Sequence, residues 1–552
     1  MIMKDIILKH TLLNAIQYSG KADIGAVVGK VLAENPELKK DMKKTMEAIS
    51  QTIKEVNSWG LKKQQKKLDE MGLKLEKKPK EYKHELPELP NADKGKVVTA
   101  FPPEPSKYPH IGHAKAALIN YLYAKKYDGK FILRFEDTNP ELAKQEYYDA
   151  ILEGLKWLGI EWDKLDYITD HMKKYYEATE ELIKENKAYA CFCKSEQIKE
   201  HRKNMTECMC RDKQTQENLG DWKKMLSGEI QEGEVSVRLK ISMQHKNAAM
   251  RDPSIMRIID RPHVRTRNKY RVWPMYDFGT TLMDSWEGVT HRIRSKEFEA
   301  RKELQNFIQK TLGFPVTYID EIARFNLEGV ESSGRKIREL IESKELLGWD
   351  DPRLTTLMAL KRRGFQPEAI RDFLLATGLT KTESTITWDK FESFNRRAIE
   401  PIANRYFAVF DPFEIKVNES PKITQAKEYL HPDHPERGSR TIPVNTSKIF
   451  ISKDDYEKYK GKKVRLIGLF NIELEKNVEY AGNEIIQEMP KIQWVSEDNI
   501  EVSVVMNDGS EKKGIAEPEV ISLKVDDIIQ FQRFGFVRLD DKRGMKFYFT
   551  HK

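Results

Sequence analysis

Two histidines and a glycine lie together in the stretch PHIGH. His110, Gly112 and His113 follow a short β-branched run and precede an amphipathic helical pattern. The free N–H groups at a helix N-terminus favour phosphate, and imidazoles beside them can bind phosphoryl oxygens as charge builds there in a transition state. Glycine lets a nucleotide approach the backbone closely. The spacing indicates phosphate chemistry, with two surface histidines in a helix cap as the alternative.

All four cysteines of the chain fall in one short segment. They form two CxC pairs, Cys191 with Cys193 and Cys208 with Cys210, separated by fourteen residues. Four thiolates can satisfy a tetrahedral Zn²⁺ and leave no position for a substrate. The pattern therefore predicts a structural zinc site in a reducing compartment. Four reduced cysteines without metal are the alternative.

The whole chain has 552 residues, a net charge of +8 and 39% hydrophobic residues. At about 100 to 200 residues per domain this predicts three to five domains and excludes wholesale disorder and fibrous repeats. The mild basic excess is weak support for an acidic partner such as nucleic acid. No stretch approaches the roughly 20 apolar residues that cross a bilayer, so we expect a soluble, cytoplasmic protein with no membrane partner.

Strand, loop, helix and strand follow one another around the histidines. KVVTAF begins at Lys96 and KFILRF at Lys130, with the helical pattern between them. Such a βαβ unit builds a parallel sheet with ligands at the carboxyl ends of its strands. The pattern is helical between about 340 and 405, and short alternating runs after about 406 predict antiparallel barrels.

Six ordered motifs carry a resemblance to a known family. FPPEP, PHIGHAKA, LRFEDTNPE, YDF, EGVTH and GWDDPR follow one another along the chain. Together they resemble glutamyl-tRNA synthetases of the archaeal and eukaryotic type, which are class I aminoacyl-tRNA synthetases with glutaminyl-tRNA synthetase as their closest relative. Six motifs in the family's order argue against a chance match.

The resemblance implies a multidomain α/β plus β protein with a Rossmann-type catalytic domain. The N-terminal segment SGKADIGAVVGKVLAENPELKK is also similar to the tail domain of tRNA amidotransferases, which indicates tRNA binding; a solvated lysine face is the alternative. The expected segments are a helical N-terminal appendage and linker (1–95), the catalytic domain in two halves (96–184 and 271–340), an acceptor-binding insertion with the zinc site (185–270), a helical connector (341–405) and anticodon-binding β-barrels (406–552).

The implied activity is ATP-dependent conversion of L-glutamate to glutamyl-AMP, assisted by Mg²⁺. Transfer to the 3′-terminal adenosine of tRNA-Glu follows, with tRNA-Gln as a second candidate. The resemblance implies that His110, Gly112 and His113 contact ATP and that the two histidines are catalytic. It also implies that Glu104 binds the substrate's ammonium group, whereas a water-exposed loop carboxylate is the alternative.

Five further residues are implied to shape the amino-acid pocket and the acceptor end. Tyr276 of YDF matches a family tyrosine that lines the pocket, and Arg294 lies where glutamyl enzymes carry arginine and glutaminyl enzymes a small neutral residue. A guanidinium pairs with a carboxylate and gains little from an amide, so glutamate is expected. Arg134, Glu136 and Asp137 of LRFEDTNP are implied to meet the tRNA acceptor end and shape the site.

The second class I signature, a lysine-containing KMSKS loop that closes on the triphosphate, is degenerate here. Its counterpart is VESSGRKI, from which Ser333, Arg335 and Lys336 carry over as catalytic residues, Lys336 also as an ATP ligand. Gly334 stands where the loop's second lysine usually lies, and Glu331 replaces its first. Arg335 or Lys336 is expected to supply the missing cation.

Residues near the first signature depart from the family as well. Ala100 replaces an arginine that helps to hold the substrate's carboxylate, and Lys107 and Pro109 replace a glycine and a leucine. Two alternatives therefore stay open, a glutaminyl-tRNA synthetase and a tRNA-binding homologue with weakened catalysis. A tRNA-modifying glutamyl transferase fits less well, because such truncated relatives lack the anticodon-binding half.

Overall fold

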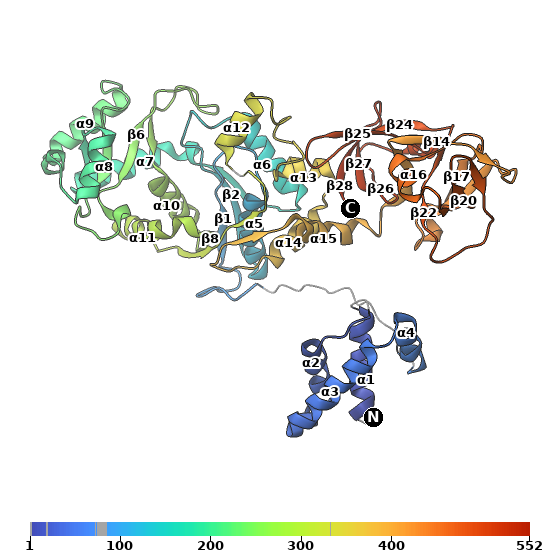
Figure 1. Cartoon of the computed structure of the whole chain (residues 1–552). Coiled ribbons are helices and arrows are strands. Elements are labelled where there is room, and N and C mark those ends of the chain that lie inside the picture. The colour runs from blue at the N-terminus through green and yellow to red at the C-terminus, as the bar shows by residue number, and fades with distance from the viewer. Residues whose placement is uncertain (1–2, 18–19, 72, 74–85, 332) are drawn as a thin grey trace. The chain divides into compact units, whose positions relative to one another are not determined.

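Two compact units make up the protein, Met1–Lys83 and His84–Lys552 (Figure 1). This computed structural model describes residues 3–17, 20–71, 73, 86–331 and 333–552. No helix in these ranges is long and apolar enough to cross a bilayer. Ser332, which belongs to the degenerate loop, lies outside them.

The first unit is helical, as the spacing of its apolar residues predicts. Ile49, Ile53 and Val56 follow one another at helical intervals and are buried against Val27 and Val31 of a neighbouring helix. Those spacings place one apolar stripe on each helix, and packing the stripes together forms the core. The helices are α1 (Met3–Gln17), α2 (Ile24–Glu34), α3 (Met42–Asn57) and α4 (Leu61–Glu70).

A five-stranded parallel sheet is the centre of the second unit. Its order is β3-β2-β1-β8-β9, so the chain leaves β1 toward one edge and later returns on its other side. A cleft forms at the carboxyl ends of the strands where the order reverses in this way. The strands are β1 (Val98–Phe101), β2 (Lys130–Phe135), β3 (Lys164–Tyr167), β8 (His291–Ser295) and β9 (Tyr318–Ile322).

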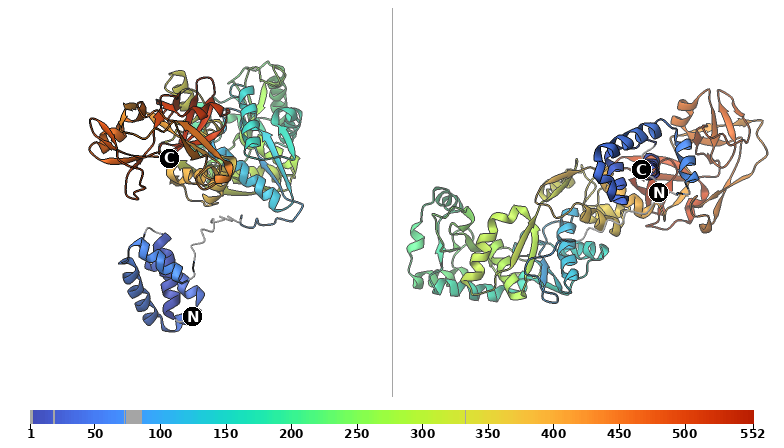
Figure 2. Two further views of the ribbon diagram at one scale, coloured as in Figure 1. Left: turned by 90° about the vertical axis from the view of Figure 1, so that its right-hand side faces the viewer. Right: turned by 90° about the horizontal axis from the view of Figure 1, so that it is seen from below.

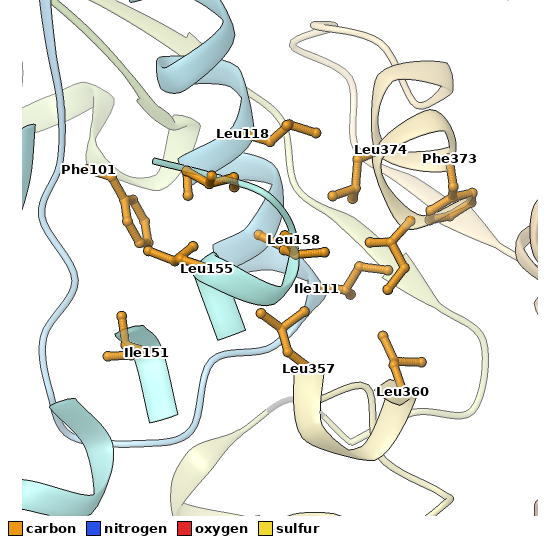
Figure 3. Close-up of a cluster of buried hydrophobic side chains, with 14 of the residues drawn as sticks. Phe101, Ile111, Leu118, Ile151, Leu155, Leu158, Leu357, Leu360, Phe373 and Leu374 are labelled. Carbon is orange, nitrogen blue, oxygen red and sulfur yellow. The ribbon is translucent and has the colours of Figure 1, made fainter. Parts of the chain in front are cut away.

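One apolar core ties this sheet to the connector helices (Figure 3). Leu118 and Leu155 from the sheet's helices are buried with Leu357, Leu360 and Phe373 from the connector, and each side chain contributes about 1.5 to 3 kcal/mol by leaving water. The core therefore fixes the connector against the first signature. The helices concerned are α5 (Ile111–Lys126), α6 (Gln145–Trp157), α13 (Leu357–Arg363), α14 (Pro367–Ala376) and α15 (Trp388–Ile399).

The insertion forms a four-stranded antiparallel sheet between the two halves of the parallel sheet's sequence. Trp222, Val237, Met256 and Trp273 are buried in its core, which is continuous with helices of the second half. The strands are β4 (Ala188–Cys191), β5 (Ser236–Leu239), β6 (Ser254–Ile258) and β7 (Val272–Pro274). The helices here and beside the parallel sheet are α7 (Met172–Lys184), α8 (Ser195–Asn204), α9 (Thr215–Ser227), α10 (Tyr276–Glu287) and α11 (Lys302–Thr311). Between sheet and connector lie β10 (Phe325–Leu327), α12 (Gly334–Glu342) and β11 (Ser384–Ile386).

The C-terminal part is β-rich and has two cores. Tyr406 and Ala408 face one core, whereas Phe407 and Val409 face the other, because alternate residues of an extended chain point to opposite sides. The connector helices lie beside this part, which both views of Figure 2 also display. Its elements are β12 (Asn404–Tyr406), β13 (Ala408–Phe410), β14 (Pro412–Ile415), β15 (Val417–Asn418), β16 (Gln425–Tyr429), β17 (Ser439–Pro443), β18 (Ile449–Ser452), α16 (Lys453–Tyr459), β19 (Lys463–Leu466), β20 (Asn471–Leu474), β21 (Val478–Tyr480), β22 (Lys491–Ile492), β23 (Val495–Ser496), β24 (Ile500–Val505), β25 (Glu511–Ala516), β26 (Ile528–Phe531), β27 (Gly535–Asp541) and β28 (Lys546–His551).

Candidate active site

A cavity of about 600 Å³ opens at the carboxyl ends of β1, β2, β8 and β9. Its volume suits a small-molecule site, and it lies where the strand order reverses. The structure therefore brings eight of the residues singled out in the sequence to one place. They are Glu104, Lys107, His110, Gly112, His113, Glu136, Tyr276 and Arg294.

The two histidines cap α5 and line the cavity at the same time. His110 Nδ1 accepts a hydrogen bond from the Gly112 N–H (3.0 Å), and His113 Nδ1 accepts one from the His110 N–H (3.2 Å). Because both Nδ1 atoms are acceptors, the neutral rings carry their proton on Nε2. A Cβ at Gly112 would lie 2.8 Å from His110 Cε1, so the capping ring itself requires glycine there.

Burial keeps both imidazoles uncharged at neutral pH. It lowers the pKa of His110 to about 3 and that of His113 well below its ordinary value, and the charge of Lys107 lowers both further. The histidines therefore act as neutral donors whose Nε2–H groups can bind an oxyanion.

Two arginines share the carboxylate of Asp284 on α10, and one of them, Arg292, lines the cavity. Arg134 Nη2 lies 3.0 Å from Asp284 Oδ1, and Arg292 Nη1 lies 2.8 Å from Asp284 Oδ2. Arg134 also pairs with Glu287 at 2.6 Å and is fully buried. Arg134 therefore holds α10 against the sheet and shapes the cavity without lining it.

Glu136 follows Arg134 and does line the cavity. Its Oε1 receives no hydrogen bond from any described residue, and Arg134 Nη2 lies 3.6 Å away. Burial raises the pKa of Glu136 to about 7, although the charges of Arg134 and Arg292 oppose this shift. Glu136 thus places a buried carboxyl at the cavity wall, whereas Glu104 is exposed and accepts from Ser106 Oγ at 2.8 Å.

Arg294 supplies positive charge on the opposite strand, β8. It donates to Gln305 Oε1 (2.7 Å) and to the Phe298 carbonyl (3.0 Å), while its Nε has no partner among the described residues. Burial and the neighbouring Arg292 lower its pKa. Tyr276 packs on Phe298 with ring centroids 5.2 Å apart, so one wall of the cavity combines a buried guanidinium with a phenol.

Asp137 lies apart from the cavity, at the end of β2. Its carboxylate accepts from the Thr169 N–H (3.1 Å), Thr169 Oγ1 (2.8 Å) and the Tyr148 hydroxyl (2.9 Å). Arg265 lies 3.5 Å away. Asp137 thus fastens the end of β2 to the 3₁₀ turn Ile168–His171.

The degenerate loop also leaves its cations outside the cavity. Ser333 caps α12, with its Oγ accepting from the Lys336 N–H at 3.4 Å. Arg335, whose side chain is 86% exposed, pairs with Glu339 at 2.9 Å, and Lys336 pairs with Glu331 at 2.9 Å.

Ala100, which replaces the family's arginine, does not line the cavity. Its side chain is fully buried and packs against Ile132 and Val289. Three cations of the lining were not singled out in the sequence. Lys115 lies within PHIGHAKA but was given no role, and Arg257 and Arg324 come from segments without a recognised signature. Burial lowers the pKa of Lys115 to about 8.

The four cysteines meet at the edge of the insertion. Their sulfurs all lie within 4.8 Å of one another, and Cys191 Sγ is 3.8 Å from Cys208 Sγ. Tetrahedral Zn–S bonds of about 2.3 Å place sulfurs roughly 3.8 Å apart, so the spacing fits one ion. Arg238 Nη1 lies 3.7 and 3.8 Å from the sulfurs of Cys191 and Cys208 and can offset thiolate charge.

Comparisons with known proteins match nearly the whole second unit. A family model described as tRNA synthetases class I (E and Q), catalytic domain, matches residues 96–401. Two models of the anticodon-binding domain of the same family match residues 403–492 and 491–540.

Curated relatives match over the full length. A glutamate–tRNA ligase of Pyrococcus furiosus is 43% identical, and the match covers 98% of this chain and 98% of that protein. Those of Thermococcus onnurineus and Thermococcus kodakarensis are each 42% identical, with complete coverage of both chains.

Proposed function

The chain belongs to the class I tRNA synthetases (E and Q), and on this premise we propose that it works as a glutamate–tRNA ligase. It activates L-glutamate with ATP to glutamyl-AMP and transfers the glutamyl group to the 3′-terminal adenosine of tRNA-Glu. One observation carries the choice of glutamate, namely that the Arg294 guanidinium lines the same cavity as His110 and His113. The relatives' names give no support to tRNA-Gln as a second substrate.

The histidine end of the cavity receives ATP. Nε2–H groups of His110 and His113 bind phosphate oxygens, and the N-terminus of α5 adds its dipole, while Gly112 keeps the capping geometry. Mg²⁺ enters with the nucleotide, because this ion is held mainly by substrate phosphates and water, and it supplies charge neutralisation. Ser333, Arg335 and Lys336 approach the triphosphate. Arg335 then leaves Glu339, and Lys336 leaves Glu331, to pair with phosphate oxygens.

The other end of the cavity receives glutamate. Arg294 pairs with the side-chain carboxylate, beside Tyr276, and the ammonium group lies between the carboxyl groups of Glu104 and Glu136. Glutamine presents an amide whose N–H₂ group faces the donors of Arg294, and leaving a buried donor unpaired costs about 1 to 3 kcal/mol. This argues against the glutaminyl alternative.

A variant of Arg294 tests this assignment. Arg294→Cys removes the partner of the side-chain carboxylate, so we expect the KM for glutamate to rise about 100-fold, since a charged hydrogen-bonded pair is worth roughly 1.5 to 3 kcal/mol. The KM for ATP stays within threefold. Arg261→Cys, at an arginine 58% exposed, is the matched control. An equal rise in both KM values would contradict the role.

The tRNA is bound along the second unit. The acceptor end meets the insertion and the loop after β2, which Arg134, Glu136 and Asp137 shape, and the anticodon meets the C-terminal β-rich part. We propose that Cys191, Cys193, Cys208 and Cys210 hold one structural Zn²⁺ that braces the insertion, with Arg238 offsetting part of the thiolate charge. Metal analysis of protein purified without chelator tests this: one zinc per chain is expected, and none in Cys208→Ser.

A further inference from the structure

The side chain of Lys107 fills the space that Gly334 leaves in the degenerate loop. A Cβ built on Gly334 would lie 2.9 Å from Lys107 Cδ, 3.5 Å from Cβ and 3.7 Å from Cγ. The stem of Lys107 therefore runs across the position where a larger residue at 334 would begin. Both residues border one small hollow, together with His110 and Trp349.

The active-site cavity is the second space that Lys107 borders. Lys107 lines it together with His110 and His113, and its charge acts on both imidazoles. Among the described residues, none is hydrogen-bonded to its ammonium or within ion-pair distance of it. Burial and the charge of Arg324 lower its pKa, although the charges of Glu104 and Glu297 oppose this shift.

The loop's own cations are differently placed. Arg335 and Lys336 pair with Glu339 and Glu331 and do not line the cavity. Lys107, from the loop between β1 and α5, thus brings to the histidine end a lysine that has no ion-pair partner among the described residues. An anion with several negative charges is the ligand that such a site favours.

We propose that Lys107 is a catalytic residue that binds the β- and γ-phosphates of ATP and supplies the cation that Gly334 does not. The inference rests on the proposed function. In the activation step, an oxygen of the glutamate α-carboxylate attacks the α-phosphorus, and the bond from this phosphorus to the α,β-bridging oxygen breaks. Pyrophosphate leaves with the bond's electron pair, and Lys107 stabilises the charge that develops while it keeps its proton.

The pair also indicates how the two loops are related in space. In the present conformation of Lys107, a side chain at position 334 would meet the lysine's stem, as the 2.9 Å approach to Lys107 Cδ indicates. An ammonium group reaching the triphosphate from either side meets the same phosphate oxygens. On this proposal, the loop after β1 supplies the charge that the loop after β10 lacks at position 334.

The test compares Lys107→Met with the exchange variant Lys107→Gly/Gly334→Lys in the full-length protein. Glutamate-dependent ATP–pyrophosphate exchange is measured with tRNA present, and ATP and AMP affinities are measured by calorimetry. Removing one donor to a transition-state charge typically costs 100- to 1,000-fold in kcat, so this loss is expected for Lys107→Met. ATP binding weakens about tenfold, AMP binding stays within twofold, and the exchange variant regains at least tenfold in kcat. Lys144→Met, at an exposed lysine, is the control and keeps the wild-type rate.

Three results would overturn the inference. They are a normal exchange rate in Lys107→Met, an equal loss of ATP and AMP affinity, and failure of the exchange variant to exceed Lys107→Met when both keep the wild-type melting temperature. A wild-type protein that activates no glutamate would refute the proposed function instead. The ATP and AMP affinities of Lys107→Met would still decide whether Lys107 binds the outer phosphates.

Discussion

At the scale of single residues, burial determines the charge of several groups that line the cavity. The histidines are neutral, Arg294 and Lys107 are cations, and Glu136 is a carboxyl whose pKa is raised to about 7. A cavity arranged in this way can accept an ammonium at one point and anions at two others. These assignments follow from hydrogen bonds and exposure, which no sequence motif specifies by itself.

The raised pKa of Glu136 predicts a pH dependence of glutamate binding. Below about pH 7 the free enzyme's carboxyl takes up a proton and loses its attraction for the ammonium group, so the KM for glutamate rises about tenfold for each further pH unit. We expect this rise between pH 7 and 5.5 in wild type and its absence in Glu136→Gln, with the KM for ATP as the internal control. A flat wild-type profile would contradict the role.

The contribution of Glu136 to folding stability changes with pH in the direction opposite to that of a normal ion-paired carboxylate. Because the folded state holds the proton of Glu136 more tightly than the unfolded state, its contribution to folding stability is present below about pH 4.5. That contribution is lost as the pH rises toward 7.

At the scale of elements, α13 connects the first signature to the C-terminal strands. The Leu357 N–H at its start donates to the Pro109 carbonyl at 2.9 Å. At its other end Arg362 Nη2 donates to Asp540 Oδ2 at 2.8 Å, and Arg363 Nη2 donates to the Thr550 carbonyl at 2.9 Å. One short helix therefore fixes the connector to the histidine loop on one side and to β27 and β28 on the other.

Removing the buried guanidinium of Arg363 should weaken this connection. Arg363→Met leaves Glu392, 3.3 Å away, and the Thr550 carbonyl without their donor, at a cost of about 3 kcal/mol. We expect a lower urea midpoint, followed by tryptophan fluorescence. Arg371→Met removes only one 3.4 Å bond to the Leu158 carbonyl and should keep the midpoint; an equal fall in both variants would refute the special role of Arg363.

Local sequence patterns predicted the helices and strands well, but they could not predict contacts between residues far apart in the sequence. The runs at Lys96 and Lys130 became β1 and β2, because alternating or continuous apolar residues report burial directly. The place of Arg257 in the cavity depends on how the insertion packs on the parallel sheet. The surroundings of Lys107 depend on the loop that contains Gly334, which lies far along the chain. Neither position has a spacing that sequence periodicity can detect.

At the scale of the whole molecule, the basic charge is unevenly distributed. Residues 1–83 contain 18 lysines, no arginine and 11 acidic residues, so this segment carries +7 of the chain's net charge of +8. Lysines bind phosphate as point charges and read no sequence. We therefore expect the first unit to bind the tRNA backbone without reading its sequence, with a merely solvated lysine face as the alternative.

The salt dependence of tRNA binding tests this distribution. Lys43 and Lys44 on α3 are exposed, and each phosphate contact contributes a slope of about 0.7 to 0.9 in a plot of log affinity against log salt. Lys43→Gln/Lys44→Gln should reduce the slope by about 1 to 2 and leave kcat at saturating tRNA unchanged. Glu47→Lys, at an exposed position of the same helix, should increase the slope; two unchanged slopes would place the tRNA elsewhere.

The central claim concerns the amino acid that this chain attaches to tRNA. Aminoacylation of total tRNA by the purified protein, with ATP, Mg²⁺ and either labelled glutamate or labelled glutamine, tests it most directly. We predict charging with glutamate and at least a 100-fold lower rate with glutamine, because the buried Arg294 lines the pocket. Charging with glutamine would contradict the role of Arg294, and tight tRNA binding without charging would contradict the ligase activity itself.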